Sequence, residues 1–145
     1  MLALAALGTG AFVLHQQRAG SDGQRHLEAA RERLEASIVD APWLDRVAAS
    51  SALSHLERAQ AQGIDGADVQ ALVVRASVLV ALQGGDLPGA TSTLQEAVEA
   101  SGWDAERHLL AAEIARRAMR LDEAEQHLAN VLRLAPEHAR GLMAA

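Results

Sequence analysis

The residues of this sequence best suited to chemistry are its six histidines, because imidazole can ligate a metal or transfer a proton near neutral pH. No two of them stand four residues apart, and none has an acidic neighbour in a metal-ligand motif, so their spacing indicates no zinc site. His108 and His127 can approach each other across a helical hairpin, yet we interpret all six as surface side chains and expect no bound metal. The six are His15, His26, His55, His108, His127 and His138.

No other motif in this sequence indicates catalysis or cofactor binding. The chain has no cysteine, which excludes disulfides, thiolate ligands and a cysteine nucleophile. Its serines lack the G-x-S-x-G pattern of a hydrolase elbow. The pair Gly84-Gly85 is followed neither by Lys-Ser/Thr nor by a three-glycine dinucleotide fingerprint, so we interpret it as a turn that ends a helix. We therefore expect a protein that is not an enzyme and that uses no cofactor and no small-molecule substrate.

Charged and aromatic residues near position 110 leave two interpretations open. Glu113, Arg116 and Arg117 stand at three- and four-residue spacings, as on a solvated helix face with weak ion pairs. The alternative is that the two arginines clamp the carboxylate of a peptide. Trp43 and Trp103 each follow a turn, where an indole either packs on the adjoining hairpin or serves as an exposed interface anchor.

The composition points to helices that pack closely. Of the 145 residues, 50% are apolar, which is enough for one domain with a core. Most of these are Ala, Leu and Val, with one Phe, two Trp and no Tyr, a composition that favours helices over sheets. All thirteen basic residues are Arg, the net charge is −6, and no basic stripe appears. Nucleic acid is therefore not an expected partner.

Apolar residues recur at helical spacing from Ser21 onward, and nothing alternates as a strand would. Asp104 suits the start of a helix as a capping residue. The helix expected at 67–83 is apolar on nearly every side, so we expect neighbours on more than one of its faces. The expected helices cover about 21–39, 42–62, 67–83, 87–100, 105–118 and 121–134, and a short last helix opens at Pro136.

The segment Met1 to Leu14 is uncharged and forms, with a linker, a separate region 1–20 before the helical domain 21–145. As a helix it would span about 21 Å, against a hydrocarbon core of about 30 Å. A membrane anchor, a signal-peptide region and a buried helix all remain open, and we favour the anchor. Arg18 and Arg25 follow the segment and would keep the domain cytoplasmic, whereas basic residues before Met1 would make it periplasmic or extracytoplasmic.

An internal repeat organises the second half of the chain. The five apolar positions Leu87, Ala90, Leu94, Ala97 and Val98 recur at one constant offset as Leu121, Ala124, Leu128, Val131 and Leu132. A period of about 34 residues indicates stacked helix pairs. With Pro136 near its end, the later unit resembles the tetratricopeptide repeat family, although Gly102 stands where that family usually has Pro.

The resemblance implies an all-α fold of antiparallel hairpins, stacked as a short right-handed solenoid behind the apolar N-terminal helix. The hairpins would be 21–62, 67–100 and 104–134, followed by the short C-terminal helix. With this spacing, Leu would fill the layer between successive hairpins. The resemblance also places the first helices along a concave groove. The implied partner-binding residues are Glu106, Leu109, Glu113, Arg116 and Arg117, with Trp103 as the anchor.

These features together predict a protein–protein interaction scaffold. We expect a membrane-associated adaptor that holds a protein or peptide partner inside a larger envelope complex. The alternative is an integral structural subunit of a membrane complex, which packs against other subunits through its N-terminal helix.

Overall fold

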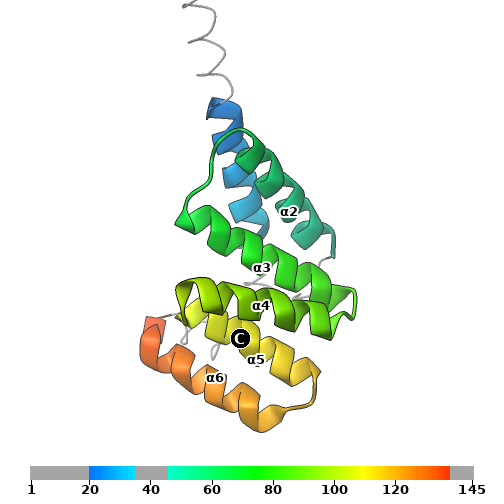
Figure 1. Ribbon diagram of the computed structural model, residues 1–145, viewed down its shortest axis with the longest axis vertical. Helices are drawn as coiled ribbons and strands as arrows, with labels where there is room; N and C mark the ends of the chain where they lie inside the picture. Colours follow the sequence, from blue (N-terminus) through cyan, green and yellow to red (C-terminus); the bar gives the residue numbers. More distant parts are fainter. Residues whose placement is uncertain (1–19, 35–45, 138–145) are drawn as a thin grey trace, which may run out of the picture.

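Helices, and no strands, form the regular structure of residues 20–34 and 46–137, the part of the chain that the computed structural model describes. The expected all-α class is therefore confirmed for these residues. The helices follow one another in chain order along the long axis of the molecule (Figure 1). After the helix at 20–34 come α2 (Arg46–Ala61), α3 (Ala67–Gln83), α4 (Leu87–Ser101), α5 (Ala105–Arg117) and α6 (Leu121–Leu134).

Local sequence signals explain where the helices begin and end. The carboxylate of Asp104 accepts a hydrogen bond from the backbone N–H of Arg107 at 2.8 Å, which confirms the expected cap of α5. Asp86 caps α4 in the same way through Gly89 N–H at 2.9 Å. Because caps and turns are set by neighbours in the sequence, the expected bounds of α3 to α6 agree with the structure within one residue.

The turns of the second and third hairpins are copies of each other, one repeat apart. The N–H of Asp86 donates to the carbonyl of Ala81 at 2.9 Å, and that of Arg120 donates to Ala115 at 2.8 Å. The residue before each donor is left-handed, with φ of 76° at Gly85 and 61° at Met119. The same backbone geometry therefore recurs although the residue types differ.

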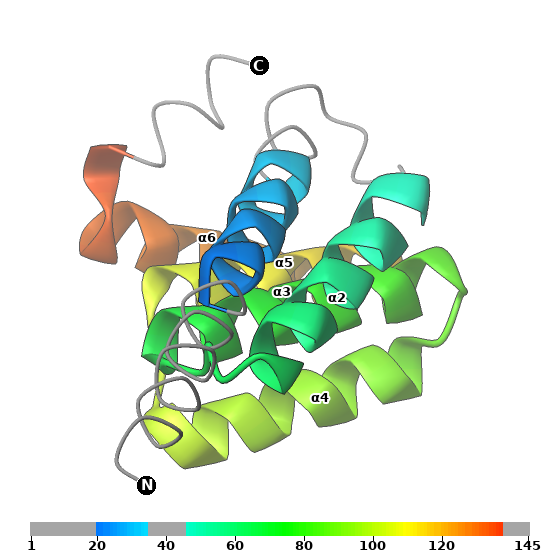
Figure 2. The same cartoon turned by 90° about the horizontal axis from the view of Figure 1, so that it is seen from above.

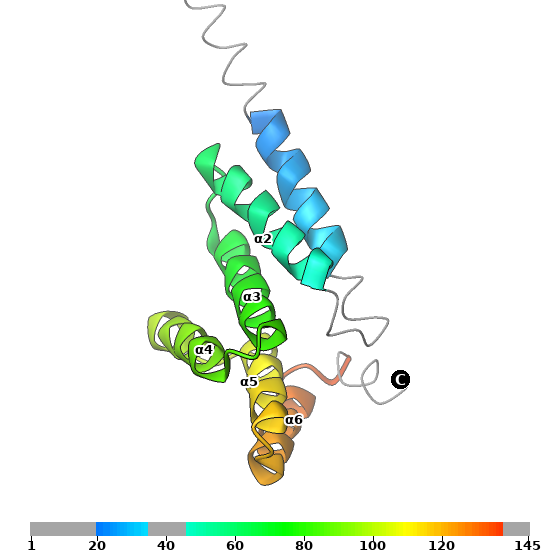
Figure 3. The same cartoon turned by 90° about the vertical axis from the view of Figure 1, so that its right-hand side faces the viewer.

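Two clusters of buried side chains share α3, as expected for a helix that is apolar on nearly every side. Val69, Ala76 and Leu79 belong to a first cluster with the helix at 20–34 and with α2. Val78 and Leu82 belong to a second cluster with α4 and α5. Figure 3 shows α3 between these two groups of helices. Because two different sides of α3 are buried, this helix packs against both groups of helices.

Among the described helices, the third hairpin contacts the second hairpin through α5 and not through α6. Among the described helices, α5 contacts α3, α4 and α6, whereas α4 and α6 do not contact each other. Figure 2 shows α4 set apart from α6, with α5 and α3 between them. This spacing leaves room for a groove over α5.

The expectation that leucine fills the layer between hairpins fails at α6. Leu94 of α4 is buried, but its equivalent Leu128 is 41% exposed, and Leu121 and Leu132 are 54% and 45% exposed. The reason is that α5 covers this side of α4, whereas no described element covers it on α6.

Several predicted features lie outside the described residues. These are the apolar segment 1–14, Trp43 and all but the first two residues of the short last helix. Among the helices that are described, none combines the length and the apolarity that a membrane crossing requires.

Candidate partner-binding site

Three of the expected partner-binding residues form an ion cluster on α5. Glu113 is only 7% exposed and accepts hydrogen bonds from Arg116, at 2.7 and 2.9 Å, and from Arg117, at 2.9 Å. Burial raises the pKa of this carboxyl, but the bonds from both arginines outweigh it and hold the pKa below its ordinary value. The same contact raises the pKa of Arg116. The solvated-face interpretation is therefore wrong for Glu113.

Arg117 extends this cluster to the neighbouring hairpin. Its Nη1 donates to the backbone carbonyl of Leu82, near the end of α3, at 2.9 Å. Hydrogen bonds therefore link the buried carboxylate, the two guanidinium groups and a carbonyl near the end of α3. The arrangement ties α5 to α3, and Arg117 would have to leave these contacts before it could hold the carboxylate of a peptide.

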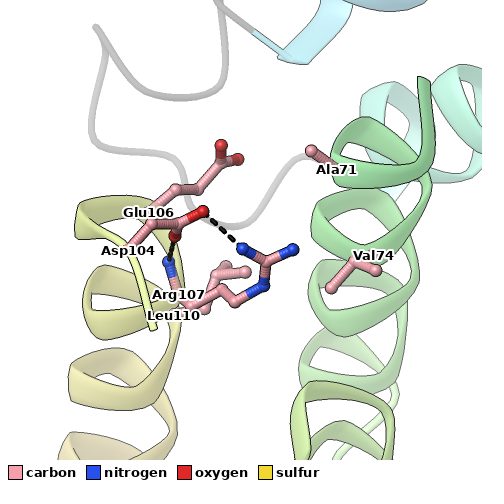
Figure 4. Close-up of a pocket in the computed structure, with 6 residues that line it drawn as sticks. All are labelled: Ala71, Val74, Asp104, Glu106, Arg107 and Leu110. Carbon is pink, nitrogen blue, oxygen red and sulfur yellow. Dashed lines mark hydrogen bonds and ion pairs between the residues drawn. The ribbon is translucent and has the colours of Figure 1, made fainter. Parts of the chain in front are cut away.

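Glu106 also lies in a contact between hairpins. Its carboxylate is 3.7 Å from Nε of Arg75, whose Nη2 donates to the carbonyl of Leu34 at 3.2 Å. Beside it, Arg107 is paired with Asp104 in a small space between α3 and α5, shown in Figure 4. The cavity measures only about 10 Å³, room for about one water molecule. This side of α5 therefore packs against the neighbouring hairpin, and the cavity between the two is too small to bind a partner.

Trp103 lies on the other side of α5, where its ring contacts the rings of two histidines. Its indole is 49% exposed and stacks on His108, with ring centroids 4.5 Å apart and an interplanar angle of 15°. The ring of His127 from α6 lies 5.3 Å away. One portion of the indole therefore packs on the hairpin and about half of it is exposed, and a role as an interface anchor stays a prediction. Leu109 is half-buried on α5.

The two histidines bond directly to each other. Nδ1 of His108 and Nδ1 of His127 are 2.9 Å apart, so one ring donates its proton and the other accepts. His108 is only 8% exposed, so the expectation of a surface side chain is wrong there. Burial, followed by His127 and Arg133, lowers the pKa of His108 against an opposing effect of Asp104.

The first hairpin repeats this pair. His26 and His55 also meet through their Nδ1 atoms at 2.9 Å. Burial, then Arg33, His26 and Arg58, lower the pKa of His55. His55 and His127 each stand three residues after a small buried residue of their helix, Ala52 and Ala124. Among the described residues, no group of three or more His, Asp or Glu side chains could hold a metal ion.

A groove of about 410 Å³ runs over α5 between α4 and α6. Its floor is apolar and continuous with the second buried cluster. Trp103 and His127 stand at one end, and Arg120 and Glu123 at the other. The floor consists of Leu94, Val98, Ala111 and Ile114, and the remaining rim of Thr91, Gln95 and Glu99.

The polar groups of the rim are largely bonded to one another. Arg120 donates to Glu123 at 2.6 Å, and Gln95 donates to Glu99 at 3.0 Å. A small-molecule site usually has a few convergent polar groups that orient its ligand. This groove instead offers an apolar floor and an aromatic wall, which suit the aliphatic or aromatic side chains of a protein.

Of the residues expected to bind a partner, only Trp103 lines this groove. The other five share α5, but the structure places Glu106, Glu113 and Arg117 in contacts that join the hairpins. The groove residues on α4 and α6 were missed because Leu94 and Val98 have the spacing of an ordinary buried face and the polar residues around them look like an ordinary solvated one. The short side chain of Ala111, which leaves the floor open, was the available signal.

Comparisons with protein-family models, with curated proteins and with solved structures found no match for this chain. The resemblance to tetratricopeptide repeats therefore stays a prediction from the spacing of the apolar residues.

Proposed function

We propose that this protein is a non-catalytic scaffold that holds a protein partner in the groove over α5. The observation that carries the proposal is the apolar floor of about 410 Å³ beside a half-exposed tryptophan. A contiguous apolar surface rimmed by polar residues is typical of a contact site for another protein. Tryptophan is enriched among the residues that dominate binding energy at protein interfaces.

The tetratricopeptide resemblance supports the same function. Stacked hairpins contact only their neighbours, so they present extended surfaces on which a partner can lie. In this proposal the solenoid belongs to a membrane-associated adaptor of an envelope complex. That part rests on the apolar segment 1–14, which lies outside the described residues.

A variant that fills the groove tests the proposal. Thr91 is exposed on the groove rim, so Thr91→Trp places an indole over the floor without changing the core. Ser92→Trp is the matched control, because Ser92 is exposed on the same helix but does not line the groove. Both variants should retain the far-ultraviolet circular dichroism and the melting temperature of the wild type.

The measurement is affinity capture of the full chain from detergent-solubilised membranes, followed by binding of the captured protein in purified form. A partner retained by the wild type and by Ser92→Trp, but lost with Thr91→Trp, supports the groove. Equal retention by both variants refutes it. Turnover by purified protein that survives removal of contaminants would refute the non-catalytic assignment.

The second candidate is an integral structural subunit of a membrane complex. The exposed leucines of α6 favour it, because an obligate subunit buries large apolar patches permanently. Size-exclusion chromatography of a chain that begins at Ser21 separates the two candidates. A stable monomer agrees with a recruiting scaffold, and aggregation agrees with an obligate subunit.

A further inference from the structure

Three aromatic rings form the end of the groove at which Trp103 stands. Trp103 and His127 line the groove, whereas His108 does not line it and is only 8% exposed. The indole stacks on His108 with ring centroids 4.5 Å apart, and Nδ1 of His108 lies 2.9 Å from Nδ1 of His127. We call these three side chains the ring cluster. Both rings that face the groove are therefore in contact with one buried histidine.

The bond between the two histidines limits how many protons the ring cluster can take. A neutral imidazole carries one N–H, so one ring donates and the other accepts. A first added proton keeps this bond, because an imidazolium still donates to a neutral ring. A second added proton would place two N–H groups against each other at 2.9 Å. The bond must then break, and the rings that it holds together separate.

The surroundings of His108 oppose even the first proton. Burial contributes most to the lowered pKa of His108, followed by His127 and by Arg133 of α6, whereas Asp104 acts in the opposite direction. The carboxylate of Asp104 is already engaged, because it caps α5 and pairs with Arg107. The neutral pair is therefore the stable form at neutral pH.

Carboxylates on the helices packed around the ring cluster give little compensation for a charged ring. Glu123 of α6 is paired with Arg120 at the other end of the groove. Glu99 of α4 lines the groove, but it is exposed and accepts a hydrogen bond from Gln95, so water and salt screen its charge. The remaining carboxylates of α3 to α6 are exposed or held in ion pairs, and they are Asp68, Glu96, Glu106, Glu113, Asp122 and Glu125.

A partner in the groove would make the charged form costlier still. Apolar side chains laid on the groove wall would remove water from His127 and from the exposed half of Trp103. Loss of water disfavours a charged imidazole. The free protein would then bind a proton more readily than the complex does, so acid weakens the complex. Affinity is complete above the pKa of the free pair and decreases as the pH falls through it.

We propose that the ring cluster makes the groove a pH-dependent binding site, which holds apolar side chains of its protein partner while the histidine pair is neutral and releases them in acid. The proposal rests on the scaffold function and adds the regulation of the same groove. Within it, His108 is a positioning residue, because it supports the wall of the groove without lining it.

The test uses the full chain and Nile red, an uncharged apolar dye, as the probe of the groove. Dye binding that Thr91→Trp removes is groove binding, and its Kd is measured from pH 7.5 to 5, with circular dichroism to check that the fold persists. A single proton that titrates no higher than the ordinary histidine value of about 6.5 weakens binding at pH 5 by at most about 30-fold. We expect groove binding to weaken about tenfold over this range.

Two double variants locate the titrating groups. His108→Val, His127→Thr removes the pair, so the Kd values at pH 7.5 and pH 5 should differ by less than about twofold. His26→Val, His55→Thr is the matched control, because it removes the equivalent pair of the first hairpin, and neither histidine lines the groove. This control should keep the dependence of groove binding on pH.

A second measurement needs neither the dye nor a change at the pair. With Trp43→Phe the emission of the chain comes from Trp103 alone. Because His108 stacks on this indole, protonation of the pair should change the emission with the same midpoint as the loss of dye. An emission that stays constant from pH 7.5 to 5 would overturn the inference.

The binding results separate this inference from the groove function. Groove binding that is equal at pH 7.5 and pH 5 overturns the regulation and leaves the groove function standing. A pH dependence that persists in His108→Val, His127→Thr, or that disappears in His26→Val, His55→Thr, assigns the titration to other groups and also overturns it. If Thr91→Trp removes no dye binding at pH 7.5, the apolar groove and its regulation both fail.

Discussion

Replacing the histidine pair of the third hairpin tests how the hairpins respond to acid. The second hairpin lacks such a pair, because Val74 and Thr93 stand at the positions equivalent to His108 and His127. The double variant His108→Val, His127→Thr therefore transfers side chains that the same fold already accommodates. It removes both partners of the bond, so no buried donor or acceptor is left behind.

The expected magnitude follows from the bond and from the direction of the pKa shift. A net contribution of about 1 kcal/mol is typical for a hydrogen bond, so stability at pH 7.5 should fall by about that amount or less. The pKa of His108 is lowered in the folded protein, which means that the unfolded chain binds the proton more readily. The stability from this group is therefore complete above the unfolded pKa near 6.5 and decreases as the pH falls through the lowered folded value.

Protonation of both rings would also place two donors against each other at 2.9 Å. The wild type should accordingly lose stability between pH 7.5 and 5, and the double variant should lose about half as much. About half is expected because His55, in the pair with His26, has its pKa lowered in the same direction and remains.

The assay is urea denaturation followed by circular dichroism at several pH values between 7.5 and 5. His26→Val, His55→Thr is the matched comparison and should reduce the pH dependence to a similar extent. If the variant of the third hairpin keeps the full pH dependence of the wild type, the pair does not couple protonation to folding and the reasoning fails.

Three further substitutions, one of them with a matched control, test the interpretation of buried charge and backbone geometry, each by urea denaturation. Glu113→Gln should destabilise the fold by about 2 kcal/mol, below the usual loss for a fully buried pair because Arg116 is partly exposed; an unchanged midpoint would contradict a structural role. Gly102→Ala should cost about 1 to 3 kcal/mol, because φ of 80° and ψ of −173° suit glycine alone, whereas Gly84→Ala at φ of −76° should be nearly neutral. Met119→Gly should stabilise by about 0.5 kcal/mol, because φ of 61° strains a side-chain-bearing residue, and any loss of stability would count against that strain.

The helices α3 to α6 and their ends were predictable because the forces that set them are local. Asp104 caps α5 through a residue only three positions away, and Leu121 to Leu134 has a periodic pattern of apolar residues. The backbone at Gly102 also explains one departure from the tetratricopeptide pattern. Proline fixes φ at about −65°, so it cannot adopt the positive φ of this turn.

The side chains expected to bind a partner were harder to assign because their roles depend on neighbours from other hairpins. Spacing along α5 indicated that Glu113, Arg116 and Arg117 interact, and they do. It contained no information that Leu82 of α3 would accept a hydrogen bond from Arg117, or that Glu113 would be buried. The approach of His108 and His127 was predictable because both lie in one hairpin, whereas the burial of His108 was not.

By itself, the sequence determined that the described residues are helical, where α3 to α6 begin and end, and that the second and third hairpins share one apolar pattern. These properties depend on residues within a few turns of one another. Only the tertiary structure decided which apolar faces stay uncovered. Leu94 and Leu128 are the same residue type in the same register, but α5 lies over one and no described helix over the other. Exposure, and with it the surface available to a partner, depends on what lies beyond the helix itself.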